Sequence, residues 1–209
     1  LGIELAEANI DFVILERRSR EELLVNTHSF YDISPSGSQA LLRVGRGRLA
    51  RALENQAVPF RTLHVHDDRG RRVCSVDTTK TSGVAGIPSF NVLRCDLLTA
   101  MVGILDDIAP GHIRFGSSVR NINRSNGTCS VTLSQGEIIA SRLLVGADGI
   151  HSTVRKKVFG DTGIRSDGIV VCWGVPPNAA SDSSIERATA ATTDTQNDGE
   201  SYMALRDSL

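Results

Sequence analysis

Two short apolar runs stand out along the chain, each followed by small or charged residues. The first spans Phe12–Leu15 and leads into Glu16-Arg17-Arg18, and the second spans Leu143–Val145 and leads into Gly146-Ala147-Asp148. A short run without polar interruption is typical of a strand buried on both faces of a parallel sheet. The two runs therefore predict two buried parallel strands.

Helical spacing accompanies both runs. Leu1, Leu5 and Ala8 share one face ahead of the first run, and residues 152–159 predict a short basic helix after the second. Residues 94–107 carry a long apolar stripe, which predicts the most regular helix of the chain. Residues 37–57 are expected to be rich in helix, and residues 19–36 to be loop with some helix.

Alternating apolar and polar positions predict strands elsewhere. Residues 61–67 and 73–76 form the pattern of a hairpin. Turn residues separate three more strands, which predict a β-meander. The meander strands are residues 119–122, 129–133 and 137–140, and two further short strands are predicted at residues 90–92 and 169–173. The sequence as a whole predicts an α/β fold.

The composition excludes several classes of protein. Of 209 residues, 40% are hydrophobic and 22% are charged, and 23 basic against 24 acidic residues give a net charge of −1. This balance argues against nucleic acid or an anionic membrane as a partner. No apolar run approaches the ~20 residues that span a bilayer, and no secretory leader pattern is visible. The widely spaced cysteines favour reduced thiols and a cytoplasmic location.

Both ends of the chain carry unusual patterns. The sequence opens at Leu1 inside a helical pattern with no capping residue before it, which predicts that the true N-terminus lies further upstream. Residues 178–200 are rich in Ser, Thr, Ala and Asp, and we expect them to be poorly ordered.

Glu16 is a candidate binding residue because it ends the first predicted strand. In nucleotide-binding βαβ units, an acidic side chain at this point accepts hydrogen bonds from ribose hydroxyls. A solvated acid at a strand end is an equally good interpretation of Glu16 alone. The Gly-rich phosphate loop that should precede the opening helix is absent from the sequence.

A glycine pattern elsewhere competes with this assignment. Residues 45–50 read Gly-Arg-Gly-Arg-Leu-Ala and match G-x-G-x-x-A, with Asp67 near the acidic position. Residues 38–44 have helical rather than strand spacing, so we expect residues 41–44 to be helical. The pattern is then a loop between two surface helices.

The stretch from Leu143 to Arg155 is the most informative part of the sequence. Its apolar run delivers Asp148 to the carboxyl end of a predicted strand, where α/β proteins bind ligands. Gly149 permits a sharp turn, and Ser152 is a suitable N-cap for the helix that follows. A strand-turn-helix without any ligand fits the same residues.

Two other groups of residues are weaker candidates. His64 and His66 lie on one strand face without a third ligand nearby in the sequence, so we expect no metal site. Four arginines between residues 43 and 51 are more typical of a solvated surface than of a phosphate site.

Residues 143–155 resemble the Asp-Gly motif of the FAD-dependent aromatic hydroxylases and related monooxygenases. Three other segments occur in the order that this family shows. Residues 10–18 resemble its second strand with the ribose-binding glutamate, residues 34–42 a helix that leads toward the substrate side, and residues 92–98 an arginine-bearing helix start. The resemblance covers residues 1 to about 175.

The resemblance implies a Rossmann-like FAD-binding domain with an inserted β-meander over residues 1–165, and part of a mixed-sheet substrate domain over residues 166–209. It implies an enzyme that uses NAD(P)H and O2 to hydroxylate a small organic molecule, with an aromatic molecule as a candidate. The cofactor carries the chemistry in such enzymes. The implied cofactor-binding residues are Glu16, Arg17, Arg94, Asp148, Gly149 and Arg155, and no side chain is implied as catalytic acid or base.

Alternatives to monooxygenation remain at this point. An FAD-dependent reductase or dehydrogenase of the same fold would carry the same motifs, and so would a non-catalytic fragment. Because pyrophosphate binding needs the glycine loop and the helix start behind it, we expect that residues 1–209 alone do not retain FAD.

Overall fold

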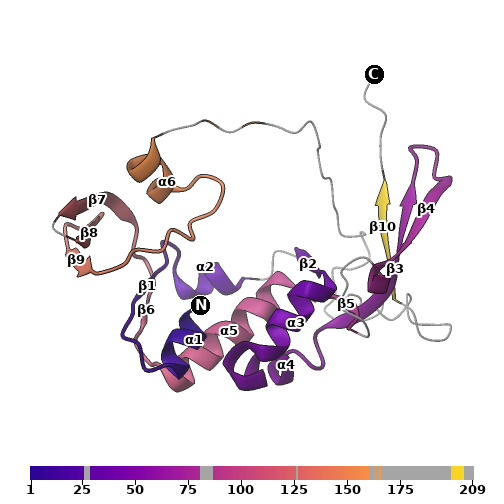
Figure 1. The fold of residues 1–209 in the computed structure, drawn as a ribbon, viewed down its shortest axis with the longest axis horizontal. Helices are drawn as coiled ribbons and strands as arrows, with labels where there is room; N and C mark the ends of the chain where they lie inside the picture. The colour runs from indigo at the N-terminus through magenta and orange to yellow at the C-terminus, as the bar shows by residue number, and fades with distance from the viewer. Residues whose placement is uncertain are drawn as a thin grey trace. The chain divides into compact units, whose positions relative to one another are not determined.

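The computed structural model describes residues 1–25, 29–80, 87–125, 127–160, 163 and 165, together with the backbone of residues 199–204. Its residues form two compact units (Figure 1). The first unit holds residues 1–11, residues 24–109 and the strand β10 (Gly199–Ala204), and the second holds residues 12–23 and 110–173 as far as they are described. The predicted division between residues 165 and 166 stays a prediction.

The first unit combines helices with one mixed sheet. Its strands run in the order β10-β3-β5-β2, and β4 pairs with β3. The β10 strand is parallel to β3, whereas β2 with β5, β3 with β4 and β3 with β5 are antiparallel. The strands are β2 (Phe30–Ile33), β3 (Val58–His66), β4 (Arg72–Asp77) and β5 (Ser89–Leu93).

Helices of the first unit pack around a common apolar core. Its largest members include Leu49, which is fully buried, and Val92, which is 2% exposed. Ser34 caps one helix by accepting a hydrogen bond from the amide of Gly37. The helices are α1 (Gly2–Glu7), α3 (Pro35–Arg43), α4 (Arg48–Ala52) and α5 (Arg94–Ile108), with 3-10 turns η1 (Val44–Gly47) and η2 (Thr78–Lys80).

The second unit contains the meander and one short parallel pair. β1 (Ile14–Leu15) pairs with β6 (Ile113–Arg114) in parallel. The strands β7, β8 and β9 form an antiparallel three-stranded sheet, which confirms the predicted meander. They are β7 (Val119–Ser125), β8 (Thr128–Leu133) and β9 (Ile138–Ser141), and the helices are α2 (Arg20–Leu24), whose last residue falls in the first unit, and α6 (Thr153–Phe159).

Several sequence predictions are confirmed. The helix at 94–107, the hairpin at 61–76, the short strand at 90–92 and the basic helix after residue 152 all form. Residues 41–44 are helical, as expected, so the glycine pattern at residues 45–50 is no strand-to-helix phosphate loop.

The predicted strand at Leu143–Val145 is wrong. No strand of the described residues pairs with it, and Leu143 is 75% exposed. A run of apolar residues becomes a strand only where a neighbour accepts and donates its backbone hydrogen bonds. For the same reason the strand predicted over Phe12–Leu15 is reduced to Ile14 and Leu15, which pair with one strand, β6, among the described residues.

Other corrections concern surfaces and long-range pairing. In α1 the buried residue is Ile3, whereas Leu1 of the predicted apolar face is exposed. The predicted loop at 19–36 contains β2, which forms through its pairing with the distant β5. The strand predicted at 169–173 and the tail at 178–198 lie outside the described residues, while Gly199 and Glu200 begin β10.

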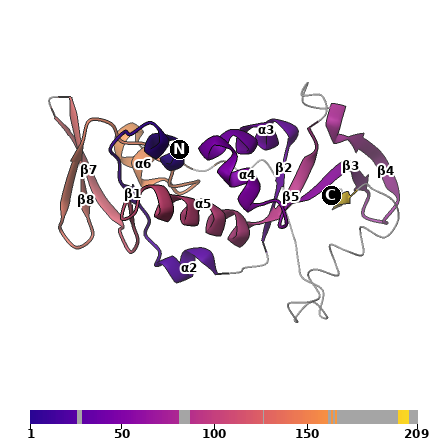
Figure 2. The same cartoon turned by 90° about the horizontal axis from the view of Figure 1, so that it is seen from below.

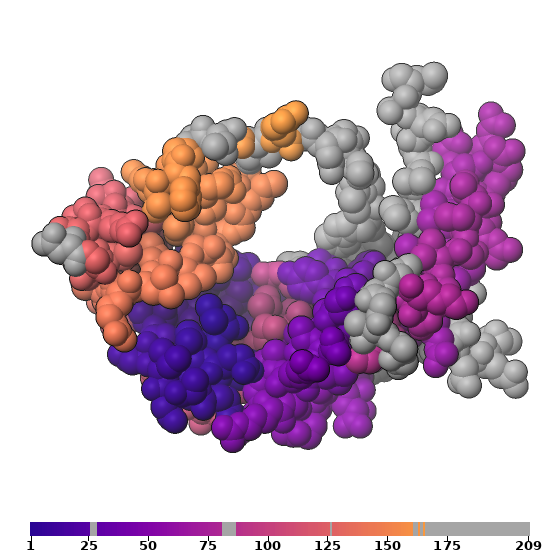
Figure 3. Space-filling model, viewed as in Figure 1, coloured from indigo at the N-terminus to yellow at the C-terminus, as the bar shows by residue number. Residues whose placement is uncertain are grey.

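A left-handed turn joins α3 to α4 and contacts α1. Gly45 and Arg46 have φ of 57° and 55°, and the amide of Gly45 donates to Glu4 Oε1 at 2.8 Å. Glu7 forms ion pairs with Arg46 and Arg48 across the same contact. Figure 3 shows the indigo surface of α1 against the purple surface of this segment.

Gly45→Ala should destabilise the protein by about 1–2 kcal/mol, because a side chain is strained at positive φ. The added Cβ would also lie 2.9 Å from Ile3 Cγ2. Gly103→Ala is the matched control, since it lies inside α5 with no atom within 4 Å of the new Cβ. Urea unfolding should show this control stabilised by about 0.5–1 kcal/mol. Equal effects of both variants would contradict the strain.

Candidate functional site

The backbone of Glu16 is held by hydrogen bonds to two residues that are distant in the sequence, Arg114 and Ser117. Its amide donates to the carbonyl of Arg114 at 3.0 Å, and its carbonyl accepts from the amide of Ser117 at 2.8 Å. These bonds continue the pairing of β1 with β6 beyond Leu15. Glu16 therefore lies at the carboxyl end of a parallel strand, as the sequence predicts.

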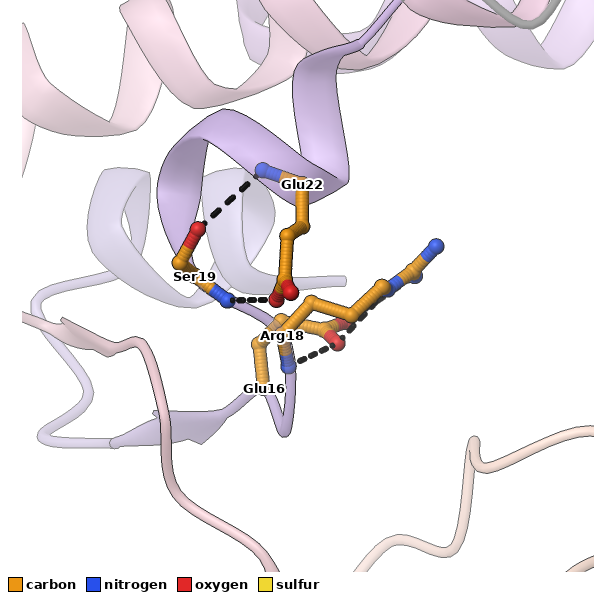
Figure 4. Close-up of polar contacts among 4 residues, drawn as sticks. All are labelled: Glu16, Arg18, Ser19 and Glu22. Carbon is orange, nitrogen blue, oxygen red and sulfur yellow. Dashed lines mark hydrogen bonds and ion pairs between the residues drawn. The ribbon is translucent and has the colours of Figure 1, made fainter.

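The Glu16 carboxylate is held by Arg18 (Figure 4). Oε1 accepts from the Arg18 amide at 2.9 Å and from its Nε at 3.0 Å, and Oε2 accepts from Nη2 at 3.3 Å. Partial burial raises the pKa of Glu16, but the bonds and charge of Arg18 outweigh it, so the pKa lies below its ordinary value. Glu16 is thus a carboxylate at neutral pH, and Arg17 beside it is exposed.

A capping box starts α2 three residues after Glu16 (Figure 4). Ser19 Oγ accepts from the amide of Glu22 at 3.1 Å, and Glu22 Oε2 accepts from the amide of Ser19 at 2.8 Å. The sequence analysis predicted neither this reciprocal cap nor the hydrogen bonds and ion pair between Arg18 and Glu16. The Ser-x-x-Glu spacing at residues 19–22 was a signal that could have revealed the cap.

The Asp148 carboxylate accepts hydrogen bonds from the first turn of α6. Its Oδ2 accepts from the amides of Thr153 at 2.7 Å and Val154 at 3.1 Å, and its Oδ1 accepts a short bond from the Ser152 hydroxyl. Some desolvation raises the pKa of Asp148, but these donors lower it further, so the pKa lies below its ordinary value. Both carboxylate oxygens are therefore used within the turn.

Two glycines shape the same turn. A Cβ on Gly146 would lie 2.7 Å from the Cβ of Val154, so only glycine lets the segment approach α6 this closely. Gly149 has φ of +78° and open space around it. Gly146 therefore serves the packing against α6, and Gly149 allows the sharp turn that the sequence predicts.

Arg155, in the first turn of α6, forms hydrogen bonds to the turn that precedes the helix. Its amide donates to Ser152 Oγ at 2.9 Å, which makes Ser152 the N-cap that the sequence predicts. Its Nη2 donates to the carbonyl of Ile150 at 2.7 Å. Asp148, Gly149 and Arg155 are thus brought together in one hydrogen-bonded turn.

Arg94 belongs to the first unit and is the first residue of α5. Its amide donates to the carbonyl of Ser29 at 2.8 Å. The side chain is partly buried, and among the described residues no hydrogen bond or ion pair engages its guanidinium group. A cation in this state is available to an anionic or polar ligand.

The weaker candidates have structural partners. His64 is buried and its Nδ1 lies 2.8 Å from Ser75 Oγ across the hairpin. In the arginine group, Arg46 and Arg48 are paired with Glu7. Within the described part of the chain, no group of three His, Cys, Asp or Glu side chains is arranged to hold a metal.

Comparisons with known proteins identify relatives of this chain. No family model matches. A curated FAD-dependent monooxygenase, esdpE of Penicillium shearii, is 30% identical over 155 residues, which are 74% of this chain and 31% of that protein. The FAD-dependent monooxygenase penE of Penicillium thymicola is 28% identical over 168 residues, which are 79% of this chain and 34% of that protein.

The chain is a homologue of FAD-dependent monooxygenases. It spans about a third of the length of these two curated relatives. No helix among the described residues is long and apolar enough to cross a membrane.

Solved structures agree on the fold. The p-nitrophenol 4-monooxygenase PnpA of Pseudomonas putida DLL-E4 superimposes with a TM-score of 0.61 at 19% identity, over 75% of this chain and 39% of that one. FqzB gives a TM-score of 0.63 at 20% identity, over 78% of this chain and 36% of that one. The α/β fold expected from the monooxygenase resemblance is confirmed.

Asp148→Ala should loosen the start of α6, because the amides of Thr153 and Val154 lose their acceptor. Loss of a cap costs about 0.5–2 kcal/mol, so these amides should exchange with solvent about tenfold faster. In the unmodified protein the same protection should hold above the ordinary pKa of Asp148 and disappear as the pH falls through its lowered pKa.

Hydrogen exchange followed by NMR measures this effect residue by residue. Asp107→Ala, in the last turn of α5, is the control and should leave the α6 amides unchanged. Unchanged exchange at Thr153 and Val154 in Asp148→Ala would contradict the capping role.

Proposed function

We propose that the protein carrying this chain is an FAD-dependent monooxygenase that uses NAD(P)H and O2 to hydroxylate a small organic molecule. The observation that carries the proposal is the similarity to FAD-dependent monooxygenases over 155 and 168 residues. An aromatic substrate and a cytoplasmic location belong to the same proposal. The location is supported by widely spaced thiols, with Cys74, Cys95 and Cys129 free.

Glu16 fits the role of ribose ligand. It is a half-buried carboxylate at the end of a parallel strand, and ribose hydroxyls are donors that such a carboxylate accepts. Arg18 holds the side chain in place, so little rotamer freedom is lost when a ligand binds. Arg17, exposed next to it, would contribute positive charge toward an anionic cofactor.

The Asp148 turn would contact the cofactor through its main chain and not through the Asp148 carboxylate. Because both oxygens of Asp148 already accept hydrogen bonds, from Ser152, Thr153 and Val154, we assign it a positioning role. Gly149, with no atom near its missing Cβ, would offer a surface where a cofactor approaches the main chain. Arg155 would keep this surface in place through its bond to Ile150.

Arg94 would supply a positive charge. Its partly buried guanidinium group has no partner among the described residues, which suits a contact with the flavin or its pyrophosphate. Bound FAD would supply the redox chemistry, accepting a hydride from NAD(P)H and activating O2. The residues of the chain would bind and orient the cofactor.

Glu16→Gln should weaken FAD binding by about ten- to a hundredfold in the complete gene product that carries this chain. Hydrogen bonds to a charged group contribute about 1.5–3 kcal/mol, and each 1.4 kcal/mol is about tenfold. Quenching of flavin fluorescence measures the affinity. Glu21→Gln, on the exposed side of α2, is the matched control. Equal weakening in both variants would contradict a specific ribose contact.

The proposed reaction predicts a coupled consumption of reductant and oxygen. With substrate present, the gene product loaded with FAD should consume NADPH or NADH and O2 in equal amounts and form a hydroxylated product. An oxygen electrode, absorbance at the nicotinamide band and mass spectrometry of the product under labelled O2 measure this. Turnover that proceeds without O2 would instead establish a reductase or dehydrogenase.

A further inference from the structure

Asp32 and Asn91 lie opposite each other on neighbouring strands of the first unit. The register pairs Asp32 of β2 with Asn91 of β5, and pairs Asn91 with Val58 of β3. Directly opposite residues of antiparallel strands carry their side chains on the same face, with Cβ atoms about 4.5–5.5 Å apart. The three residues therefore form a row across the sheet, with two polar members side by side.

Asn91 carries an acceptor without a donor. Among the described residues, its Oδ1 is the one buried side-chain nitrogen or oxygen atom that has no hydrogen-bond partner. Buried polar atoms are satisfied almost without exception in native proteins, so an unsatisfied one requires an explanation. A donor from a bound molecule would provide it.

Asp32 lacks the hydrogen-bond donors that Glu16, Asp67 and Asp148 have among the described residues. Asp32 is an exposed residue, no hydrogen bond or ion pair to it occurs among the described residues, and partial desolvation of its carboxyl group raises its pKa. Glu16, Asp67 and Asp148 differ, because hydrogen-bond donors lower the pKa of each. Asp32 and Asn91 thus place an exposed acceptor beside a buried one, and no donor among the described residues meets either of them.

The two side chains leave the sheet on the face away from α3. Successive residues of a strand point to opposite faces. Ile33, which follows Asp32, contacts α3, since a Cβ on Gly37 would lie 2.9 Å from Ile33 Cγ2. Val92, which follows Asn91, is buried in the core. Figure 2 shows α3 beside β2 and β5.

We propose that Asp32 and Asn91 form a recognition pair for a hydroxyl or amino group of the substrate, an inference that rests on the monooxygenase function proposed above. Two adjacent acceptors select a group that brings hydrogen atoms. They disfavour an analogue methylated at that group, because it brings no hydrogen atom for the buried Asn91 acceptor. Specificity at this position then depends on the donor and not on the size of the ligand.

Phenol and anisole test this selection, since they differ only by a methyl group in place of the hydroxyl hydrogen. Titration calorimetry on the FAD-loaded gene product should give phenol at least about tenfold tighter binding than anisole. Asp32→Leu and Asn91→Leu should each reduce the preference to within about twofold. Benzylamine in the same titration separates an amino preference from a hydroxyl preference, and tighter binding than anisole by either donor supports the pair.

A stability measurement separates recognition from a structural role. Asn91→Leu removes an unsatisfied buried acceptor, so it should raise the melting temperature of the ligand-free protein while it weakens phenol binding. A structural Asn91 would give a lower melting temperature. Asn121→Leu, on the exposed side of β7, is the control and should leave phenol binding unchanged.

Three results would overturn the inference. Anisole could bind as tightly as phenol, or the phenol preference could survive in both leucine variants. Asp32→Leu could also release FAD while phenol binding stays intact, which would assign the donor to the flavin ring. Flavin content, read separately from the visible spectrum, keeps this outcome apart from failure of the monooxygenase proposal, in which the unmodified protein binds no flavin.

Discussion

Backbone amide donors at the ends of strands and helices determine where the candidate binding residues lie. Each helix start leaves amides without partners inside the helix. In the second unit these donors are met by polar side chains: Asp148 and Ser152 serve α6, and Ser19 with Glu22 serves α2. The Asp148 turn is rigid for this reason. A cofactor would meet a prearranged main chain and lose little to ordering it.

Local signals in the sequence were sufficient for the elements that depend on near neighbours. The cap at Ser152, the helix predicted over residues 94–107 and the meander each depend on residues a few positions apart, and all three form. Pairing between distant segments could not be predicted from such local signals. The β2 strand forms only because residues 89–93 lie alongside it, and Leu143–Val145 has the apolar pattern of a strand without a paired neighbour among the described residues.

Candidate site residues follow the same division. Glu16, Asp148 and Arg94 were identified from motifs, because each belongs to a short segment with a recognisable order of residue types. Arg18 escaped notice because its function depends on a contact with Glu16 that spacing alone does not specify. Asp32 and Asn91 are 59 residues apart in the sequence, and only the register of β2 and β5 brings them together.

The carboxylates of the chain divide by the donors around them, and this division bears on function. Asp148 is satisfied within its own turn, so its effect on a ligand has to pass through the main chain. Glu16 is held from one side by Arg18 and stays charged, which leaves it able to accept from a ribose. Asp32 is exposed, has no donor among the described residues, and lies opposite the buried acceptor of Asn91, which has none either. Among the described residues Asn91 Oδ1 is the one buried side-chain polar atom without a partner, and local violations of this kind concentrate at functional sites, which favours a ligand at this position.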